Sequence, residues 1–297
     1  MNKFVERLKA GEVLVADGAT GTNLQKVGLV GGIHTEDWVF DEPKKILDLE
    51  KAFVAAGSDI LLTCTFGGTR PRMQGAKHGD QVYEINKRAV ELAREAASAR
   101  DDVLVAGSMG PIGKLLKPYG PLTHEEARDA FAEQAKALAE GGVDFLLFET
   151  HFALNEVDAG LEGARSVTDL PIVVSFSYDR GTRTMMGVKP TEVIKKYEPM
   201  GVTMIGANCG TTLENMETIL KEYGSVDPGF PLWAKPNAGI PRLVNGETLY
   251  DVTPEQMADF AKKYVSLGAR VVGGCCGSTP EHVAAIVKTV KRKKDER

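Results

Sequence analysis

The chain has 297 residues, of which 43% are hydrophobic and 26% are charged, and its formal net charge is −5. A chain of this size can bury a large core, and we expect one domain over residues 1–297. The acidic balance excludes nucleic acid as the main partner, because phosphate binding requires a basic surface. Four cysteines do not make a disulfide scaffold.

The amino-terminal segment 1–15 is charged and amphipathic and lacks the apolar stretch of a signal peptide. No run in the sequence approaches the roughly 20 apolar residues of a membrane span, so we expect no membrane contact. These features together predict a cytoplasmic protein in a reducing compartment.

Eight short apolar runs rich in Val, Ile, Leu and Phe follow one another along the chain. Continuous apolar runs of this length are typical of strands that are buried on both faces of a parallel sheet. The predicted strands are VLVADGA from Val13, DILLTCTF from Asp59, VLVAGSMG from Val103, DFLLFET from Asp144, PIVVSFSY from Pro171, MIGANCG from Met204, PLWAKPNAG from Pro231 and ARVVGGCCG from Ala269.

Helix-start signals lie between the predicted strands. Thr123 with Glu126, and Thr253 with Gln256, have the spacing of a capping box, and Thr279 precedes a proline at a first helical position. Strands that alternate with helices predict a parallel sheet of the α/β class, and eight such units favour a single (β/α)₈ TIM barrel. An open, doubly wound sheet is the structural alternative.

Polar and thiol side chains collect where the predicted strands end, although the strand bodies are almost wholly apolar. In a (β/α)₈ barrel the carboxyl ends of the strands share one rim, and the chemistry is found there. The residues at these ends are Asp17, Cys64, Ser108, Glu149, Asn208, Cys209, Asn237, Cys275 and Cys276.

Three of these cysteines predict a metal site. Cys209 ends the sixth strand and the Cys275–Cys276 pair ends the eighth, so one strand separates them on the rim. Three thiolates in one place suit Zn²⁺, and three protein ligands leave one coordination position open, as in catalytic zinc sites. Glycines on both sides of the pair let the backbone bend toward one ion. The alternative is a set of buried, unpaired thiols.

The same motifs resemble those of the homocysteine-binding S-methyltransferase family. The resemblance rests on GANCG followed by GGCCG, on an opening DGATGTNL and on a central FET, and it runs from about Asp17 to Gly277. Stretches such as VYEINKRAVELAREAA look most like the homocysteine module of cobalamin-dependent methionine synthase. The family implies an enzyme in which Cys209, Cys275 and Cys276 hold zinc. Homocysteine would bind as the fourth ligand, a thiolate, and be methylated to methionine.

The resemblance also implies how the substrate is held. Asp17 and Glu149 correspond to the positions that hold the α-ammonium of homocysteine. We expect backbone N–H groups around Gly18 and Ala19 to receive the α-carboxylate, and Asn208 to take part in the substrate site by orienting the rim. Alternatively, Asp17 caps its own turn and Glu149 forms a salt bridge inside the barrel mouth.

Other features of the rim are open to a structural reading. Cys64 is expected to be a small core residue rather than a zinc ligand. His34 and His151 either line the mouth or have structural roles. The glycine-rich stretch 107–121 lacks the spacing of a phosphate-binding loop, and we expect it to act as a lid or as a surface that docks the donor.

The sequence after Gly277 contains nothing that resembles a cobalamin- or folate-binding domain, so we expect the methyl donor to be supplied externally. The likeness to methionine synthase favours methylcobalamin, free or carried by a corrinoid protein. The alternatives are S-methylmethionine or S-adenosylmethionine as donor, and another thiol as acceptor. A zinc-binding scaffold of a methyltransferase complex is the non-enzymatic alternative, and a scaffold would not need a complete substrate site.

Overall fold

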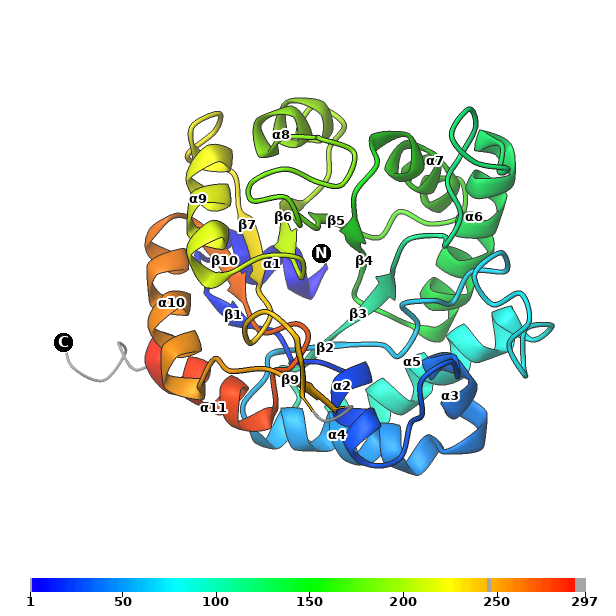
Figure 1. The fold of residues 1–297 in the computed structure, drawn as a ribbon, viewed down its shortest axis with the longest axis horizontal. Coiled ribbons are helices and arrows are strands. Elements are labelled where there is room, and N and C mark those ends of the chain that lie inside the picture. Colours follow the sequence, from blue (N-terminus) through cyan, green and yellow to red (C-terminus); the bar gives the residue numbers. More distant parts are fainter. Residues whose placement is uncertain (1, 245–246, 292–297) are drawn as a thin grey trace.

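The computed structural model describes residues 2–244 and 247–291, in which eight parallel strands form one closed barrel (Figure 1). Around the barrel the strands follow the order β1-β10-β7-β6-β5-β4-β3-β2, and a parallel bridge between Ala16 and Ile60 joins its two ends. This closure confirms the predicted (β/α)₈ barrel and rules out an open sheet. The strands are β1 (Leu14–Val15), β2 (Ile60–Leu62), β3 (Leu104–Met109), β4 (Phe145–His151), β5 (Ile172–Phe176), β6 (Met204–Asn208), β7 (Leu232–Lys235) and β10 (Ala269–Val272).

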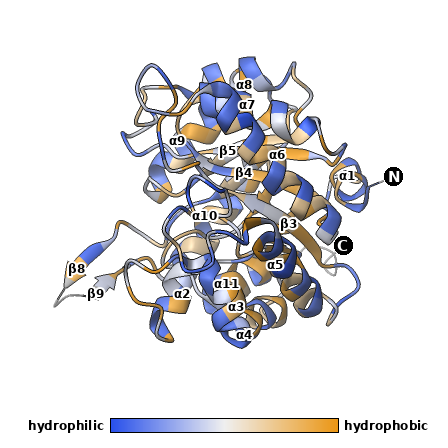
Figure 2. Ribbon diagram, turned by 90° about the vertical axis from the view of Figure 1, so that its right-hand side faces the viewer, coloured by the Kyte–Doolittle hydropathy of each residue, from blue (hydrophilic) through white to orange (hydrophobic). Residues whose placement is uncertain are grey.

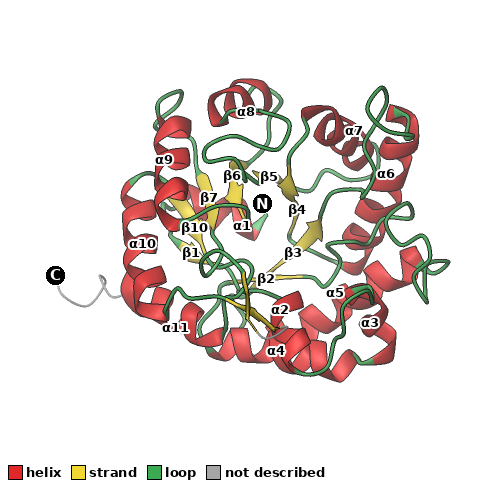
Figure 3. Cartoon of the chain, in the orientation of Figure 1, coloured by secondary structure: helices red, strands yellow, loops and turns green. Residues whose placement is uncertain are grey.

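Helices surround the barrel (Figure 3). Thr123 and Thr253 form the predicted capping boxes, and α11 begins at Pro280 as expected. None of the helices in the described ranges is long and apolar enough to cross a membrane. The helical elements are α1 (Lys3–Lys9), α2 (Gly21–Lys26), η1 (Thr35–Asp37), α3 (Trp38–Asp41), α4 (Pro43–Ala55), α5 (Val82–Ala97), α6 (His124–Gly141), α7 (Leu154–Arg165), α8 (Pro190–Tyr197), α9 (Leu213–Gly224), α10 (Pro254–Ser266) and α11 (Pro280–Val290).

Large apolar side chains fill the interior of the barrel at the end where the strands begin. Phe4 of α1 is fully buried, and its ring stacks on Phe145 with a centroid distance of 4.0 Å. Phe145 in turn meets Trp233 edge to face, and the Asn2 side chain donates to the carbonyl of Asp144, just before β4. The amino-terminal helix therefore closes the end of the barrel where the strands begin, and leaves the opposite end for the polar residues.

A small antiparallel hairpin stands away from the barrel (Figure 2). It consists of β8 (Arg242–Val244) and β9 (Glu247–Leu249), in the connection between β7 and α10. This hairpin was not among the predicted elements. The signal that would have found it is the Asn-Gly dipeptide at 245–246, which is typical of two-residue hairpin turns.

The contact between β6 and β7 depends on the absence of a side chain at Gly206. A Cβ atom at this position would lie 1.9 Å from the carbonyl oxygen of Trp233, a backbone atom that cannot rotate away. We therefore expect Gly206→Ala to lower the free energy of unfolding by about 2 kcal/mol or more, as overpacked cores do. Urea unfolding followed by circular dichroism measures the change.

Gly224→Ala is the matched control. Gly224 ends α9, and a Cβ there would meet nothing within 4 Å. Its substitution should leave stability unchanged or raise it by up to about 1 kcal/mol, because alanine favours the helix. Equal unfolding midpoints for the two variants would show that β6 and β7 do not pack as described.

Candidate functional site

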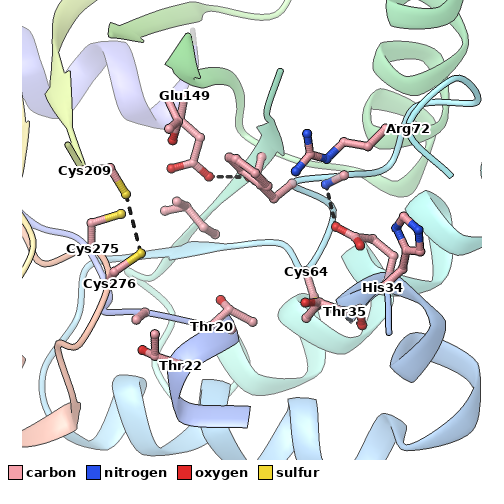
Figure 4. A pocket seen from close by; sticks show the side chains of 18 of the residues that line it. Thr20, Thr22, His34, Thr35, Cys64, Arg72, Glu149, Cys209, Cys275 and Cys276 are labelled. Atoms are coloured by element: carbon pink, nitrogen blue, oxygen red, sulfur yellow. Dashed lines mark hydrogen bonds between the residues drawn. The ribbon is translucent and has the colours of Figure 1, made fainter. Parts of the chain in front are cut away.

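A cavity of about 830 Å³ opens at the carboxyl ends of the strands, and we call it the rim cavity (Figure 4). Three thiols and Glu149 lie on one side of it, whereas Cys64, His34 and Arg72 lie on the other. Its lining includes Gly18, Ala19, His34, Cys64, Arg72, Ser108, Gly113, Lys114, Glu149, Cys209, Lys235, Tyr250, Cys275 and Cys276. The cavity is within the size range of small-molecule sites and is larger than an amino acid requires.

The three predicted cysteines meet in the rim cavity. The sulfurs of Cys209, Cys275 and Cys276 all lie within 4.8 Å of one another, and those of Cys209 and Cys276 are 3.6 Å apart. Two sulfurs bound at 2.3 Å to one tetrahedral zinc ion are separated by about 3.8 Å. The spacing and the chemistry of the three donors therefore fit a zinc ion.

The three thiols affect one another's protonation through their hydrogen bonds. Hydrogen bonds from Cys209 and Cys275 lower the pKa of the Cys276 thiol, since they stabilise its thiolate. The pKa of Cys209 is raised by its hydrogen bonds with Cys275 and Cys276 and by burial. The hydrogen bond with Cys209 lowers the pKa of Cys275, but the hydrogen bond with Cys276 and burial outweigh it, so that this pKa is raised as well. One negative charge thus forms easily, and further charges need a positive ion to balance them.

Asn208 braces the backbone around the thiols. Its Oδ1 accepts from the Thr150 N–H at 2.9 Å and from the Ser175 hydroxyl at 2.6 Å. Its Nδ2 donates to the Thr150 hydroxyl at 2.7 Å and lies 3.8 Å from the Cys275 sulfur. Thr150 and Cys209 both have positive φ, a strained conformation for non-glycine residues that surrounding contacts must hold. Asn208 is fully buried and is not among the residues that line the cavity.

Asp17 lies directly after β1 and is paired with a lysine that the sequence analysis did not single out. Its Oδ1 accepts from the Lys235 ammonium at 2.7 Å, and its Oδ2 accepts from the Leu62 N–H at 2.7 Å. Both side chains of the pair are almost completely buried. Burial raises the pKa of Asp17, while Lys235 acts in the opposite direction. The sequence signal that could have identified Lys235 is a lysine at the end of a predicted apolar strand, PLWAKPNAG.

Glu149 projects from β4 into the rim cavity and accepts a hydrogen bond from the Ser108 hydroxyl. Burial raises the pKa of Glu149 to about 7, and the nearby Lys235 ammonium counteracts the effect. Near neutral pH, a positively charged ligand in the cavity would therefore favour the ionised form of Glu149.

Gly18 and Ala19 form the adjoining wall. A Cβ atom at Gly18 would lie 2.8 Å from the Phe53 ring and 2.9 Å from the Ser278 hydroxyl, so only glycine fits there. The N–H of Ala19 donates to the Ser278 carbonyl at 3.3 Å. A ligand at this wall would have to replace or share that hydrogen bond to reach the Ala19 N–H.

Cys64, His34, His151 and the glycine-rich stretch 107–121 lie in or near the rim cavity. Cys64 is buried and lies outside the thiol cluster, as expected, although it lines the far side of the rim cavity. His34 lines the cavity, whereas His151 is fully buried, with its Nε2 3.2 Å from the Met109 carbonyl. The glycine-rich stretch supplies Gly113 and Lys114 to the lining.

The chain is similar to known proteins over almost its whole length. The sequence profile of the homocysteine S-methyltransferase family matches residues 14–290. Methionine synthases of Mycobacterium leprae and Mycobacterium tuberculosis are each 30% identical to the chain, over 96% and 94% of its length respectively. The chain spans only 25% of either of these proteins.

Solved structures show the same fold. The metallated form of the homocysteine methyltransferase MmuM from Escherichia coli superposes with a TM-score of 0.81 and is 25% identical, covering 96% of this chain and 99% of that one. A methyltransferase from Methanosarcina mazei has a TM-score of 0.61 at 14% identity over 97% of both chains, which is a likeness of fold alone.

Metal removal tests the three-thiol cluster directly. In zinc-loaded protein the cluster should be unreactive toward a disulfide reagent such as DTNB, and a chelator should expose three further thiols, because only free thiolates attack the reagent. Buried Cys64 should react only after unfolding.

Cys64→Ser is the matched control, and it should show the same increase of three thiols on chelation. An identical count of reactive thiols with and without the chelator would contradict a metal site at these residues.

Proposed function

The chain belongs to the homocysteine S-methyltransferase family, and from this premise we propose that it methylates the thiol of homocysteine to form methionine. The observation that carries the proposal is the meeting of three thiols and a buried carboxyl group on one wall of a cavity large enough for an amino acid. A scaffold protein would have no use for this combination.

We propose that Cys209, Cys275 and Cys276 hold Zn²⁺, which their spacing and donor chemistry fit. When bound, zinc keeps a thiol deprotonated at neutral pH and so supplies a nucleophilic sulfur. Asn208 contributes by fixing the backbone beside Cys209 and by contacting the Cys275 sulfur. In this role Asn208 supports the substrate site from behind its wall.

The chain's own residues position the amino-acid part of the substrate. The carboxylate of Glu149 lines the cavity and binds the α-ammonium, and the Ser108 hydroxyl fixes its orientation. Asp17 lies beneath this surface and acts through its pair with Lys235. Gly18 and Ala19 shape the wall at which the α-carboxylate lies.

We propose a methylated corrinoid as the donor, either free methylcobalamin or a corrinoid protein. The likeness to methionine synthases over nearly the whole chain supports this choice. Exposed apolar side chains in the connections that leave the carboxyl ends of the strands also support it, because they are available to a docking partner. These side chains are Val27, Val30, Ile33, Leu115, Tyr119, Met185, Met186, Ile240, Leu243 and Leu249. Of these side chains, Ile33 lines the rim cavity.

S-methylmethionine is the alternative donor, because the rim cavity has room for a second small molecule beside homocysteine. Zinc-loaded protein should form methionine from homocysteine when it is offered methylcobalamin, and the rate should exceed that with S-methylmethionine. Parallel assays with the two donors, with methionine measured by mass spectrometry, make the comparison. Turnover with S-methylmethionine alone would refute the corrinoid proposal, and failure with both would refute homocysteine methylation by these donors.

Glu149→Ala should raise the KM for homocysteine by about 10- to 100-fold, because a charge-assisted hydrogen bond to the ammonium is lost. Zinc content should not change, since Glu149 is not in the thiol cluster. Steady-state kinetics and metal analysis measure both quantities.

Cys276→Ser is the matched comparison, since it should lose zinc and all methyl transfer together. An unchanged KM for Glu149→Ala would show that the α-ammonium is held elsewhere. Full zinc content in Cys276→Ser would show that the metal assignment is wrong.

A further inference from the structure

Lys235 is a charged residue that lines the rim cavity and to which the proposed reaction assigns no contact with the substrate. It is the last residue of β7, its side chain is 2% exposed, and it lines the cavity. Lysine is almost never fully buried without a partner, because removal of its ammonium from water is costly. Its partner here is Asp17, at 2.7 Å.

The pair presents its positive member to the cavity. Lys235 is among the lining residues and Asp17 is not, and both oxygens of Asp17 already accept hydrogen bonds. A ligand in the cavity therefore meets the ammonium of Lys235 before it meets the carboxylate of Asp17. The assignment of the α-ammonium to Asp17 and Glu149 stays a prediction, and of these two side chains Glu149 is the one that lines the cavity.

The ammonium of Lys235 has hydrogen-bonding capacity to spare. Its Nζ carries three N–H bonds, and among the described side chains Asp17 is its one hydrogen-bond acceptor. A buried ammonium gains from further acceptors, and a carboxylate is the acceptor that also matches its charge.

Glu149 lies close enough for its charge to act on Lys235, and so does Cys275. Next to the thiols the cavity thus presents the carboxyl group of Glu149 and the ammonium of Lys235. An α-amino acid carries the complementary pair, an ammonium and a carboxylate. Other charged side chains, Glu36, Arg72 and Lys114, also line the cavity, and Arg72 lies on the side opposite the thiols. The wall at Gly18 and Ala19 offers weaker complementarity, because the Ala19 N–H already donates to Ser278.

We propose that Lys235 is a specificity-determining residue that binds the α-carboxylate of the acceptor. The enzyme then selects thiols that carry a carboxylate and discriminates against those that carry an ammonium alone. The inference rests on the proposed function and deepens it, since it names the chemical class of acceptor that the site takes.

The test compares binding of methionine with binding of 3-(methylthio)propylamine, which lacks only the carboxylate. Isothermal titration of the zinc-loaded chain of 297 residues needs neither a donor nor turnover. Wild type should prefer methionine by about 10- to 100-fold, the range of a charge-assisted hydrogen bond. In Lys235→Met the preference should fall to within about twofold.

Two further variants separate recognition from a structural role. The double variant Asp17→Asn/Lys235→Met removes both charges, so no unpaired carboxylate is left buried, and it too should bind the two ligands about equally. Lys235→Arg keeps the charge and should keep part of the preference. If Lys235 served only to neutralise Asp17, the loss of Lys235 would weaken the binding of both ligands to the same extent and leave the ratio of their affinities unchanged.

A preference for methionine that persists in Lys235→Met and in the double variant would overturn the inference, and so would the absence of a preference in wild type. Methyl transfer to homocysteine by the same wild-type preparation keeps the two proposals apart. Methyl transfer without a Lys235-dependent preference would refute only the binding of the α-carboxylate by Lys235. The absence of methyl transfer would refute the proposed function on which that inference rests.

Discussion

The site depends on bringing three sulfurs from two non-adjacent strands within reach of one ion. β6 and β10 are both neighbours of β7, so Cys209 and the Cys275–Cys276 pair meet over the end of β7. Barrel closure fixes this arrangement, because the hydrogen-bonded register allows little sliding between strands. The positive φ of Cys209 and the contacts of Asn208 then aim the sulfurs inward. The same rim collects the charged groups that we propose to position a substrate beside them.

Burial of charge is the second constraint on the site. Asp17, Glu149 and Lys235 are all nearly inaccessible to solvent, and each would be costly without its partners. Lys235 links the two carboxyl groups, since it is hydrogen-bonded to Asp17 and its charge acts on Glu149. A site of this kind is arranged before the ligand arrives and does not have to reorganise when the substrate binds.

The barrel and its rim residues were predictable because they follow from local patterns. Apolar runs, capping boxes and the order of strands and helices are visible in short windows of sequence, and barrel geometry then places Glu149, Cys209, Cys275 and Cys276 on one rim. The ion pair between Asp17 and Lys235 joins residues that are 218 positions apart, and no local pattern reports it. The hydrogen bond from the Ala19 N–H to the Ser278 carbonyl is equally hard to predict from the sequence, since it depends on how two loops pack. Sequence reasoning therefore found the thiols and carboxyl groups of the rim, but it found neither Lys235 nor which of these side chains face the cavity.

X-ray absorption at the zinc edge tests the central claim most directly, because it counts the sulfur atoms bound to the metal. Protein loaded with one zinc ion should show three sulfur ligands, from Cys209, Cys275 and Cys276, and a lighter atom in the fourth position. Addition of homocysteine should raise the count to four sulfurs. A count that stays at three in saturating homocysteine would contradict direct activation of the substrate thiol at this site.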